Sequence, residues 1–121
     1  MLRTKRIYAE PAPEDGKRYL VDRLWPRGIS KARASLDAWL KDVAPSQELR
    51  NWFDHDPARW EAFQERYQAE LRQGAARELV EKLARESLQE TVTLLYAAKD
   101  ETRNNAVSLK TIIETLQQPA T

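Results

Sequence analysis

The chain of 121 residues contains no cysteine, only three glycines and a single histidine, His55. Without cysteine it has no disulfide, thiolate metal site or cysteine nucleophile, which fits a reducing compartment. One histidine argues against a tetrahedral zinc site. Three glycines are too few for a glycine-rich phosphate loop. We therefore predict a cytoplasmic protein that needs neither a metal ion nor a cofactor.

An excess of charge of one sign and long apolar runs are also absent. The 20 Lys and Arg residues nearly balance 19 Asp and Glu, giving a formal net charge of +1. No overall field then favours nucleic acid or a membrane surface. No apolar run approaches the roughly 20 residues of a membrane-spanning helix, and no secretory signal follows the basic first residues. We expect no membrane association, and nucleic acid is a disfavoured partner.

What is present is an alternation of short apolar strands with helices. Runs rich in β-branched and aromatic residues predict strands over residues 5–9, 18–25 and 91–98. Helical periodicity and capping residues predict helices over residues 36–43, 46–53, 57–72, 75–86 and from 103 or 104 onward. Ser35, Ser46 and Asp56 are the expected N-caps of the first three of these helices.

This order of elements predicts an α/β fold, because strands separated by long connections can pair in parallel. We expect a small, three-layer-like single domain over residues 1–121, with a short, mainly parallel sheet, flanking helices and a loose tail from about residue 118. The helices between residues 36 and 86 are too many for a simple crossover, so some should form a lobe beside the sheet. An extra strand within a segment read as helix stays open.

Charged residues follow two of the predicted strands. The apolar strand near Tyr19 ends in Asp22 and Arg23, and the strand from residue 91 ends in Lys99 and Asp100. A buried charge costs several kcal/mol unless it is paired or used in function. Ligands of parallel sheets bind beyond the carboxyl ends of the strands. The sequence therefore predicts one shared polar site at these ends.

Two interpretations of this site stay open. In the first, the charges form a structural network in which Lys99 pairs with Asp22 and Asp100 pairs with Arg23. In the second, they bind an anionic ligand such as a nucleotide, a phosphate or a nucleic-acid fragment, because the planar arginine side chain suits phosphate and carboxylate. The pattern does not distinguish a binding protein from an enzyme.

Candidate residues follow from the second interpretation. The candidate catalytic residues are Asp22, which could orient the cations or act as a base, and His55, the only imidazole. The candidate ligand-binding residues are Arg23, Arg27, Lys41, Arg50, Tyr96, Lys99, Asn104 and Asn105. The paired asparagines stand where a helix begins, and helix N-termini favour anions.

Two other function classes make different predictions. A nucleic-acid-binding or transcription-associated module should carry a contiguous basic face and bind in a strongly salt-dependent way. A non-catalytic interaction module should expose an apolar patch around Trp52, Phe53 and Trp60.

The same segments contain a specific combination of motifs: Val21-Asp22-Arg23-Leu24-Trp25-Pro26-Arg27-Gly28, Trp39-Leu40-Lys41-Asp42, Ala44-Pro45-Ser46, Leu49-Arg50, Trp52-Phe53, His55, Leu94-Leu95-Tyr96-Ala97-Ala98-Lys99 and Asn104-Asn105-Ala106. From Lys5 to about Leu109 the chain resembles the domain of unknown function 488 (DUF488) family, in its short YeaO-like branch. The resemblance implies a compact α/β domain in bacterial or archaeal cytoplasm whose polar motif residues converge, and it implies no particular activity.

The chain departs from the family pattern at two positions. Asp54 stands where glycine is usual, and Arg103 stands where a histidine often precedes the paired asparagines. If that histidine had a chemical role in the family, this chain either lacks the role or binds through arginine instead.

Overall fold

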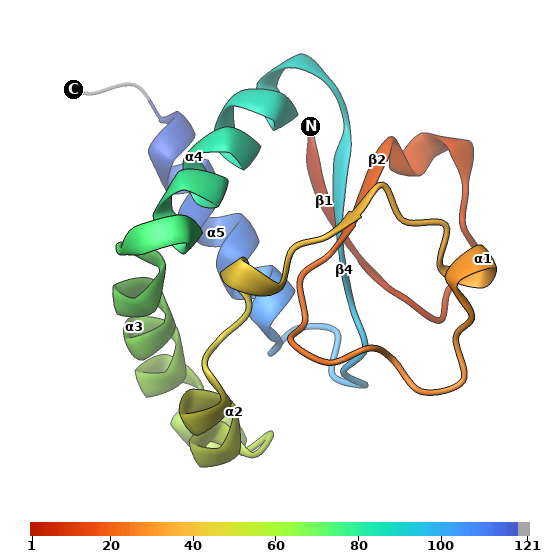
Figure 1. Ribbon diagram of the computed structural model, residues 1–121. Helices are drawn as coiled ribbons and strands as arrows, with labels where there is room; N and C mark the ends of the chain where they lie inside the picture. Colours follow the sequence, from red (N-terminus) through yellow and green to blue (C-terminus); the bar gives the residue numbers. More distant parts are fainter. Residues whose placement is uncertain (119–121) are drawn as a thin grey trace.

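The computed structural model, which describes residues 1–118, has a four-stranded sheet whose neighbouring strands are all parallel. The strand order is β1-β4-β2-β3 (Figure 1). The strands are β1 (Leu2–Arg6), β2 (Lys17–Leu20), β3 (Ala38–Trp39) and β4 (Val92–Tyr96). The predicted α/β class and parallel sheet are confirmed. The tail expected beyond residue 118 lies outside the described residues.

Five α-helices lie within the described part of the chain: α1 (Lys31–Ala34), α2 (Gln47–Phe53), α3 (Trp60–Leu71), α4 (Gly74–Gln89) and α5 (Asn105–Gln117). Two predicted caps, Ser46 and Asp56, are confirmed, and Asn104 is the cap of α5. The side chains of all three accept a hydrogen bond from a backbone N–H at the start of a helix. Asp56 precedes a short 3-10 turn that leads into α3.

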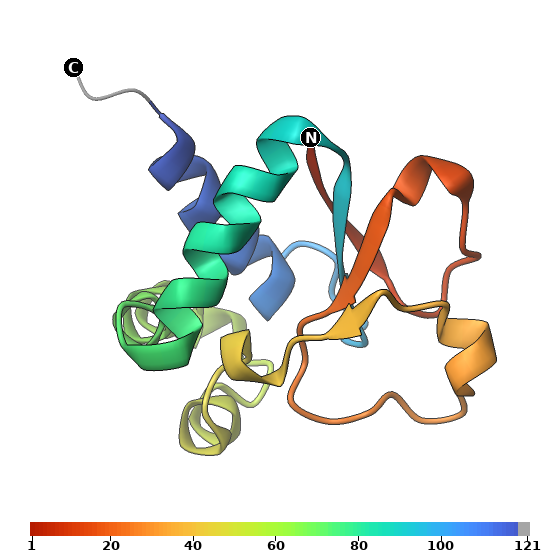
Figure 2. The same ribbon diagram turned by 45° about the horizontal axis from the view of Figure 1, so that its top comes forward.

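The sheet lies between two unequal layers. Val92, Leu94 and Tyr96 of β4 point into the larger core, which the long helices α3, α4 and α5 cover. The opposite face holds a small cluster of Ile7, Leu20, Ala34 and Leu95, beside the short helix α1. Figures 1 and 2 show α1 on the far side of the sheet from α4. The expected three-layer arrangement is therefore present, with one thin layer.

The predicted helix over residues 36–43 is wrong. Residues 38–39 form β3, and a 3-10 turn follows over residues 41–43. The N–H groups of Asp37 and Leu40 donate to the carbonyls of Arg18 and Leu20 in β2, both at 2.8 Å. A free sheet edge supplies these partners, which the local apolar spacing could not reveal. The extra strand left open by the sequence is present here.

Ser35 is correspondingly not an N-cap. It ends α1 in a left-handed conformation with φ of 48°. The residues expected to be a polar connection form α1 itself, with Ser30 as its N-cap. The first two strands are also displaced from their predicted bounds: β1 begins earlier, and β2 ends at Leu20 instead of residue 25.

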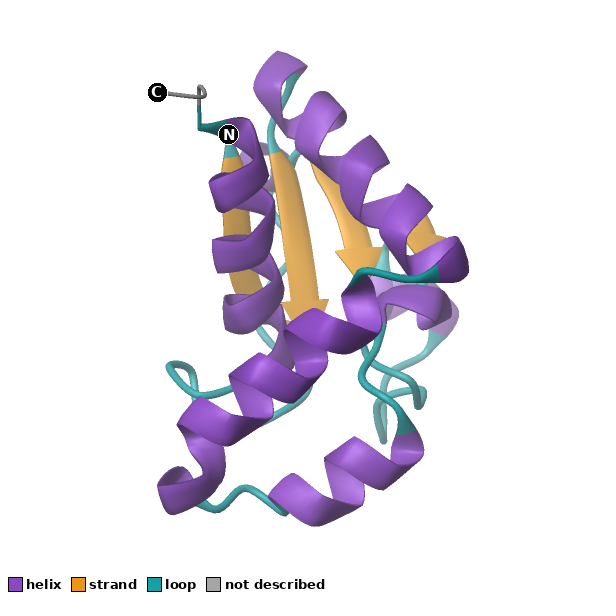
Figure 3. Cartoon of the chain, turned by 90° about the vertical axis from the view of Figure 1, so that its left-hand side faces the viewer, coloured by secondary structure: helices purple, strands orange, loops and turns teal. Residues whose placement is uncertain are grey.

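Helices α2 and α3 form the expected lobe. Figure 3 shows them extending past the carboxyl ends of the strands. Within the lobe, Ser46 at the start of α2 is tied to α3, because its backbone N–H and hydroxyl both donate to the Glu70 carboxylate, at 2.8 and 2.6 Å. None of the helices within residues 1–118 combines the length and apolar character needed to cross a bilayer.

A buried ion cluster lies on the thin side of the sheet. Asp15, only 1% exposed, forms ion pairs with Lys5 and with the buried Arg18. The remaining N–H groups of the Arg18 guanidinium donate to the carbonyls of Ala34 and Ser35, at 2.8 and 3.1 Å. The carboxylate of Asp15 also accepts from the N–H of Ala12. Each charge in this cluster thus finds its partner within the protein.

Candidate functional site

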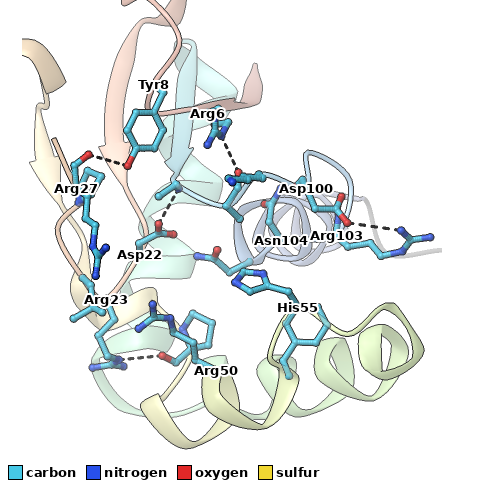
Figure 4. Close-up of a pocket in the computed structure, with 18 of the residues that line it drawn as sticks. Arg6, Tyr8, Asp22, Arg23, Arg27, Arg50, His55, Asp100, Arg103 and Asn104 are labelled. Atoms are coloured by element: carbon cyan, nitrogen blue, oxygen red, sulfur yellow. Dashed lines mark hydrogen bonds and ion pairs between the residues drawn. The ribbon is translucent and has the colours of Figure 1, made fainter. Parts of the chain in front are cut away.

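A pocket of about 940 Å³ opens at the carboxyl ends of β2 and β4 (Figure 4). After β2 the chain continues to α1 on one face of the sheet, and after β4 it continues to α5 on the opposite face. Neighbouring parallel strands whose connections leave in opposite directions create a crevice between their ends, and ligands of α/β proteins bind there. The topology itself therefore places this pocket.

Cations outnumber acids in the lining of the pocket. The acidic residues are Asp22 and Asp100. The cations are six in number: Arg6, Arg23, Arg27, Arg50, Lys99 and Arg103. This excess contrasts with a formal net charge of only +1 for the whole chain. Positive charge is therefore concentrated in this pocket.

Three of these cations are held by the protein. Arg6 donates through Nε to the carbonyl of Ala98 at 3.0 Å, and its guanidinium lies over the Tyr8 ring. Arg23 donates to the carbonyls of Pro45 and Ala44, at 3.0 and 3.3 Å. Backbone carbonyls neutralise little of the charge, so both side chains are fixed in place but remain cationic.

Arg103, the third of these cations, lies 3.7 Å from the carboxylate of Asp100. Asp100 in turn accepts from the backbone N–H groups of Thr102 and Arg103, which lowers its pKa below the ordinary value. The acid is thus used within its own loop. This explains why the predicted pair between Asp100 and Arg23 is wrong.

The other three cations have no such partners. Within residues 1–118, the side chains of Arg27, Arg50 and Lys99 take part in no ion pair and no hydrogen bond, and all three are exposed. The carbonyl of Arg27, but not its guanidinium, is engaged, since it accepts from the Tyr8 hydroxyl at 2.9 Å. These three side chains are free to meet a ligand.

Asp22 joins the two strands at the base of the pocket. Its carboxylate accepts from the N–H of Ala97 at 2.9 Å, which ties the end of β2 to the end of β4. Burial raises the pKa of Asp22 above its ordinary value, although the Ala97 N–H, the Asn105 amide and the charge of Arg50 act in the opposite direction. The predicted pair with Lys99 is wrong, because Asp22 finds its partners in the strand end and in α5.

An aromatic wall closes the pocket on the side of α2 and α3. Phe53 and Phe63 stack with ring centroids 4.5 Å apart, and the exposed His55 ring lies 6.3 Å from Phe53. Asp54 and His55 both adopt left-handed backbone conformations, with φ of 45° and 54°. Glycine adopts this conformation without steric cost, which accounts for the glycine usual at position 54 in the family.

The structure brings most of the sequence-predicted site residues together. Those that line the pocket are Asp22, Arg23, Arg27, Arg50, His55, Lys99, Asn104 and Asn105. Asn104 is the cap of α5 and also donates to the carbonyl of Asp100, and Asn105 donates to the carbonyl of Val21 at 3.0 Å. The two asparagines therefore build the floor of the site through the backbone.

Lys41 and Tyr96 do not line the pocket. Lys41 lies beyond the edge strand β3, with its Nζ 4.0 Å from the centre of the Trp39 ring. Tyr96 is the last residue of β4 and is buried in the larger core, because its position in the strand alternation points it toward α5.

Sequence reasoning missed Arg6 and Tyr8, which reach the pocket from the end of β1. Ligands of parallel sheets bind beyond the carboxyl ends of the strands, and this strand-end rule would have found both residues had β1 been predicted to end at Arg6. The exposed apolar patch expected around Trp52, Phe53 and Trp60 is absent from this part of the described chain. Phe53 is buried, and the two tryptophans are half-buried against the larger core.

No group of three or more potential metal-ligating side chains occurs within residues 1–118. The donor set of the pocket, rich in guanidinium and poor in carboxylate, also suits an anion better than a metal cation.

Comparison with known proteins supplies the remaining evidence. Residues 1–120 match a family model described as "Inactive DUF488-N3 subclade". The chain is 42% identical over 112 residues to the uncharacterized protein Rv3073c of Mycobacterium tuberculosis (strain H37Rv), covering 93% of this chain and 92% of that protein. It is 43% identical over 108 residues to the uncharacterized protein YeaO of Escherichia coli (strain K12), covering 89% and 92%. No solved structure matches the chain.

Proposed function

The chain belongs to the DUF488 family, in the subclade described as inactive DUF488-N3, and from this premise we propose that it binds a small anionic ligand in the pocket at the ends of β2 and β4. The anion is a phosphate or carboxylate group carried by a larger molecule. The description of the subclade as inactive supports binding without chemical conversion of the ligand.

One observation carries the proposal: three cations without protein partners share one pocket with cations that are already fixed there. Arg27, Arg50 and Lys99 carry the same charge as Arg23 and line the same pocket, so they repel one another. An anion bound among them converts the repulsion into attraction. Charge-assisted hydrogen bonds to guanidinium are about twice as strong as neutral ones.

The arrangement around Asp22 supports a binding role more than a catalytic one. Its carboxylate accepts from the N–H of Ala97 and so joins the ends of two strands, a structural role that requires no proton transfer. Position 103, where the family often has histidine, carries an arginine that lines the pocket. That substitution removes an imidazole and adds a permanent cation.

A cytoplasmic location is part of this proposal. A chain without cysteine has no use for the oxidising conditions in which disulfides form. Fractionation of cells that produce the tagged protein tests the location, and recovery in a membrane or periplasmic fraction would contradict it.

The binding proposal is tested by thermal unfolding of the protein with inorganic phosphate, pyrophosphate and citrate, each compared with chloride at equal ionic strength. We expect pyrophosphate to raise the unfolding temperature in a saturable way, because a ligand that binds only the folded state stabilises it. Isothermal titration calorimetry then gives the affinity, which should fall as salt is added.

The matched control is Arg85→Ala, which removes an exposed cation of α4 outside the pocket lining. This variant should respond to pyrophosphate as the wild type does. An equal loss of response in Arg85→Ala and Arg27→Ala would mean that the anions act only on the overall charge, and the proposal would fail.

A further inference from the structure

This inference rests on the proposed function and names the class of ligand: we propose that the pocket binds a free nucleoside phosphate. Its phosphate lies among Arg27, Arg50 and Lys99, its sugar hydroxyls lie near Asp22, and its base lies against the aromatic wall at His55. Three separate features of the pocket, namely its size, its aromatic side and the acid at its base, support this assignment.

The pocket has room for a ligand larger than a bare anion. A volume of about 940 Å³ lies near the upper end of the range in which pockets enclose drug-sized molecules, roughly 300–1,000 Å³. A phosphate or a small dicarboxylate would occupy only the part beside the cations. The remaining space can hold a second, uncharged moiety attached to the anion.

The side away from Arg27 has the chemistry that such a moiety would need. Figure 4 shows His55 and Arg27 on different sides of the pocket, with Asp22 between them. His55 presents an exposed ring, and the stacked pair Phe53 and Phe63 lies behind it. Any nucleobase can stack on such side chains, because every base has a flat aromatic face.

The acid between the two sides explains the choice of a nucleoside over another aromatic phosphate. In α/β proteins that bind nucleotides at strand ends, a carboxylate typically accepts from the ribose hydroxyls. Asp22 holds the corresponding place in this pocket. The carboxylate of Asp22 accepts one hydrogen bond from the backbone, from the N–H of Ala97. A carboxylate can accept several hydrogen bonds, so acceptor capacity is left for a sugar hydroxyl.

The surroundings of the pocket favour a free nucleotide over a nucleic-acid strand. A strand needs a basic track that continues beyond the first phosphate. Here acids lie beside the pocket cations and the aromatic side: Asp54 and Asp56 flank His55, and Lys99 is followed by Asp100, which lines the pocket, and by Glu101. Further phosphates of a polymer would meet these carboxylates.

Calorimetric titration with a panel of defined probes tests the inference: adenosine monophosphate, uridine monophosphate, ribose phosphate, adenosine, inorganic phosphate and a phosphorylated oligonucleotide. We expect at least one nucleoside monophosphate to bind about tenfold or more tightly than ribose phosphate, because stacking of one base supplies that factor. Adenosine without phosphate should bind more weakly than the nucleotide.

Two variants separate the parts of the site. Arg27→Ala should weaken the binding of every phosphate-bearing probe. His55→Asn should reduce the affinity for nucleotides toward that for ribose phosphate and leave ribose phosphate unchanged. Asparagine is chosen because it tolerates the left-handed conformation of this position, and His55 is exposed, so the variant should fold.

The outcomes distinguish this inference from the proposed function. Binding of inorganic phosphate or ribose phosphate with no gain for nucleotides would overturn the nucleoside assignment and leave anion binding intact. Tighter binding of the oligonucleotide than of either nucleotide would overturn the assignment to a free ligand. If none of the anions binds, both the inference and the proposed function fail.

Discussion

Asp15 and Asp22 belong to two charged regions of the same small sheet, and their surroundings are opposite. Asp15 lies in the buried cluster with Lys5 and Arg18, where the carboxylate accepts from two cations and a backbone N–H. Asp22 lies at the base of the pocket, where cations surround it but none forms an ion pair with it.

The pKa values of the two acids are shifted in opposite directions, in line with this difference in surroundings. Burial by itself would raise the pKa of Asp15, but the hydrogen bonds from Ala12, Lys5 and Arg18 outweigh burial and lower it. For Asp22, burial prevails and raises the pKa. The difference shows which charges the fold satisfies internally and which it leaves for a ligand: the first kind should determine stability, and the second kind should determine binding.

The largest expected effect is the loss of the buried acid. Asp15→Ala leaves the charges of Lys5 and Arg18 without their partner in a buried site, which typically costs about 3–5 kcal/mol of unfolding free energy. Urea denaturation followed by circular dichroism measures this cost. A loss below about 1 kcal/mol would mean that the cluster stabilises the fold no more than a surface pair does. That result would contradict the claim that the buried cluster determines stability.

Removal of a pocket cation should weaken ligand binding and leave the unfolding free energy almost unchanged. Arg27→Ala is expected to weaken the binding of pyrophosphate by about tenfold or more, since a charged hydrogen bond contributes roughly 1.5–3 kcal/mol. Its unfolding free energy in the absence of ligand should change by no more than about 0.5 kcal/mol, because the side chain has no partner among the described residues. Calorimetry and urea denaturation on the same preparation give both numbers.

A strong destabilisation by Arg27→Ala would place this residue with the buried cluster instead of the pocket. Lys99→Ala provides an independent copy of the experiment from the other strand end, and its stability should likewise be unchanged.

The two acids should also give opposite dependences of stability on pH. The folded state holds the proton of Asp22 more tightly than the unfolded state, whose pKa is near 3.8. Stability from this group is therefore lost as the pH rises from 3.8 through the higher folded value. The advantage of Asp22→Asn over the wild type should grow across this window in urea titrations.

Asp15 acts in the other direction. Because its folded pKa lies below 3.8, it contributes stability above that pH, and the contribution is lost as the pH falls through the folded value. Asp15→Asn should remove this acid-side loss. If both variants changed the same side of the pH profile, the two acids would not differ as described.

The smallest effect is expected for an exposed pair that belongs to neither region. Arg77 and Glu81 of α4 lie 3.2 Å apart with side chains 67% and 47% exposed. Glu81→Ala should change the unfolding free energy by less than about 0.5 kcal/mol and leave the affinity for pyrophosphate as it is. This variant serves as the baseline for both stability and binding measurements.

Local signals in the sequence were sufficient for much of the fold. Ser46 and Asp56 cap the helices they were expected to cap, because capping depends on residues a few positions apart. The segment 36–43 failed because its fate depends on β2, which offers a free edge to Asp37 and Leu40. A short apolar segment has no local property that records such a neighbour.

The candidate site was likewise only partly predictable from the sequence. The strand-end rule found Arg27 and Lys99, since parallel strands bring their carboxyl ends to one edge. It could not predict the partners of Asp22 and Asp100, which are backbone N–H groups selected by the exact course of two loops. The cluster around Asp15 was missed altogether, because a residue in a short segment after two prolines gives no indication that Arg18 and Lys5 will enclose it.

Nuclear magnetic resonance with pyrophosphate tests the central claim most directly, because backbone amide signals report where an anion binds. The account predicts saturable shifts confined to residues 6–8, 22–28, 45–55 and 97–105, which border the pocket, and none at residues 12–18 around the buried cluster. Shifts scattered over the surface cations, or no saturable shift at all, would contradict the claim that the fold holds these pocket cations for a ligand.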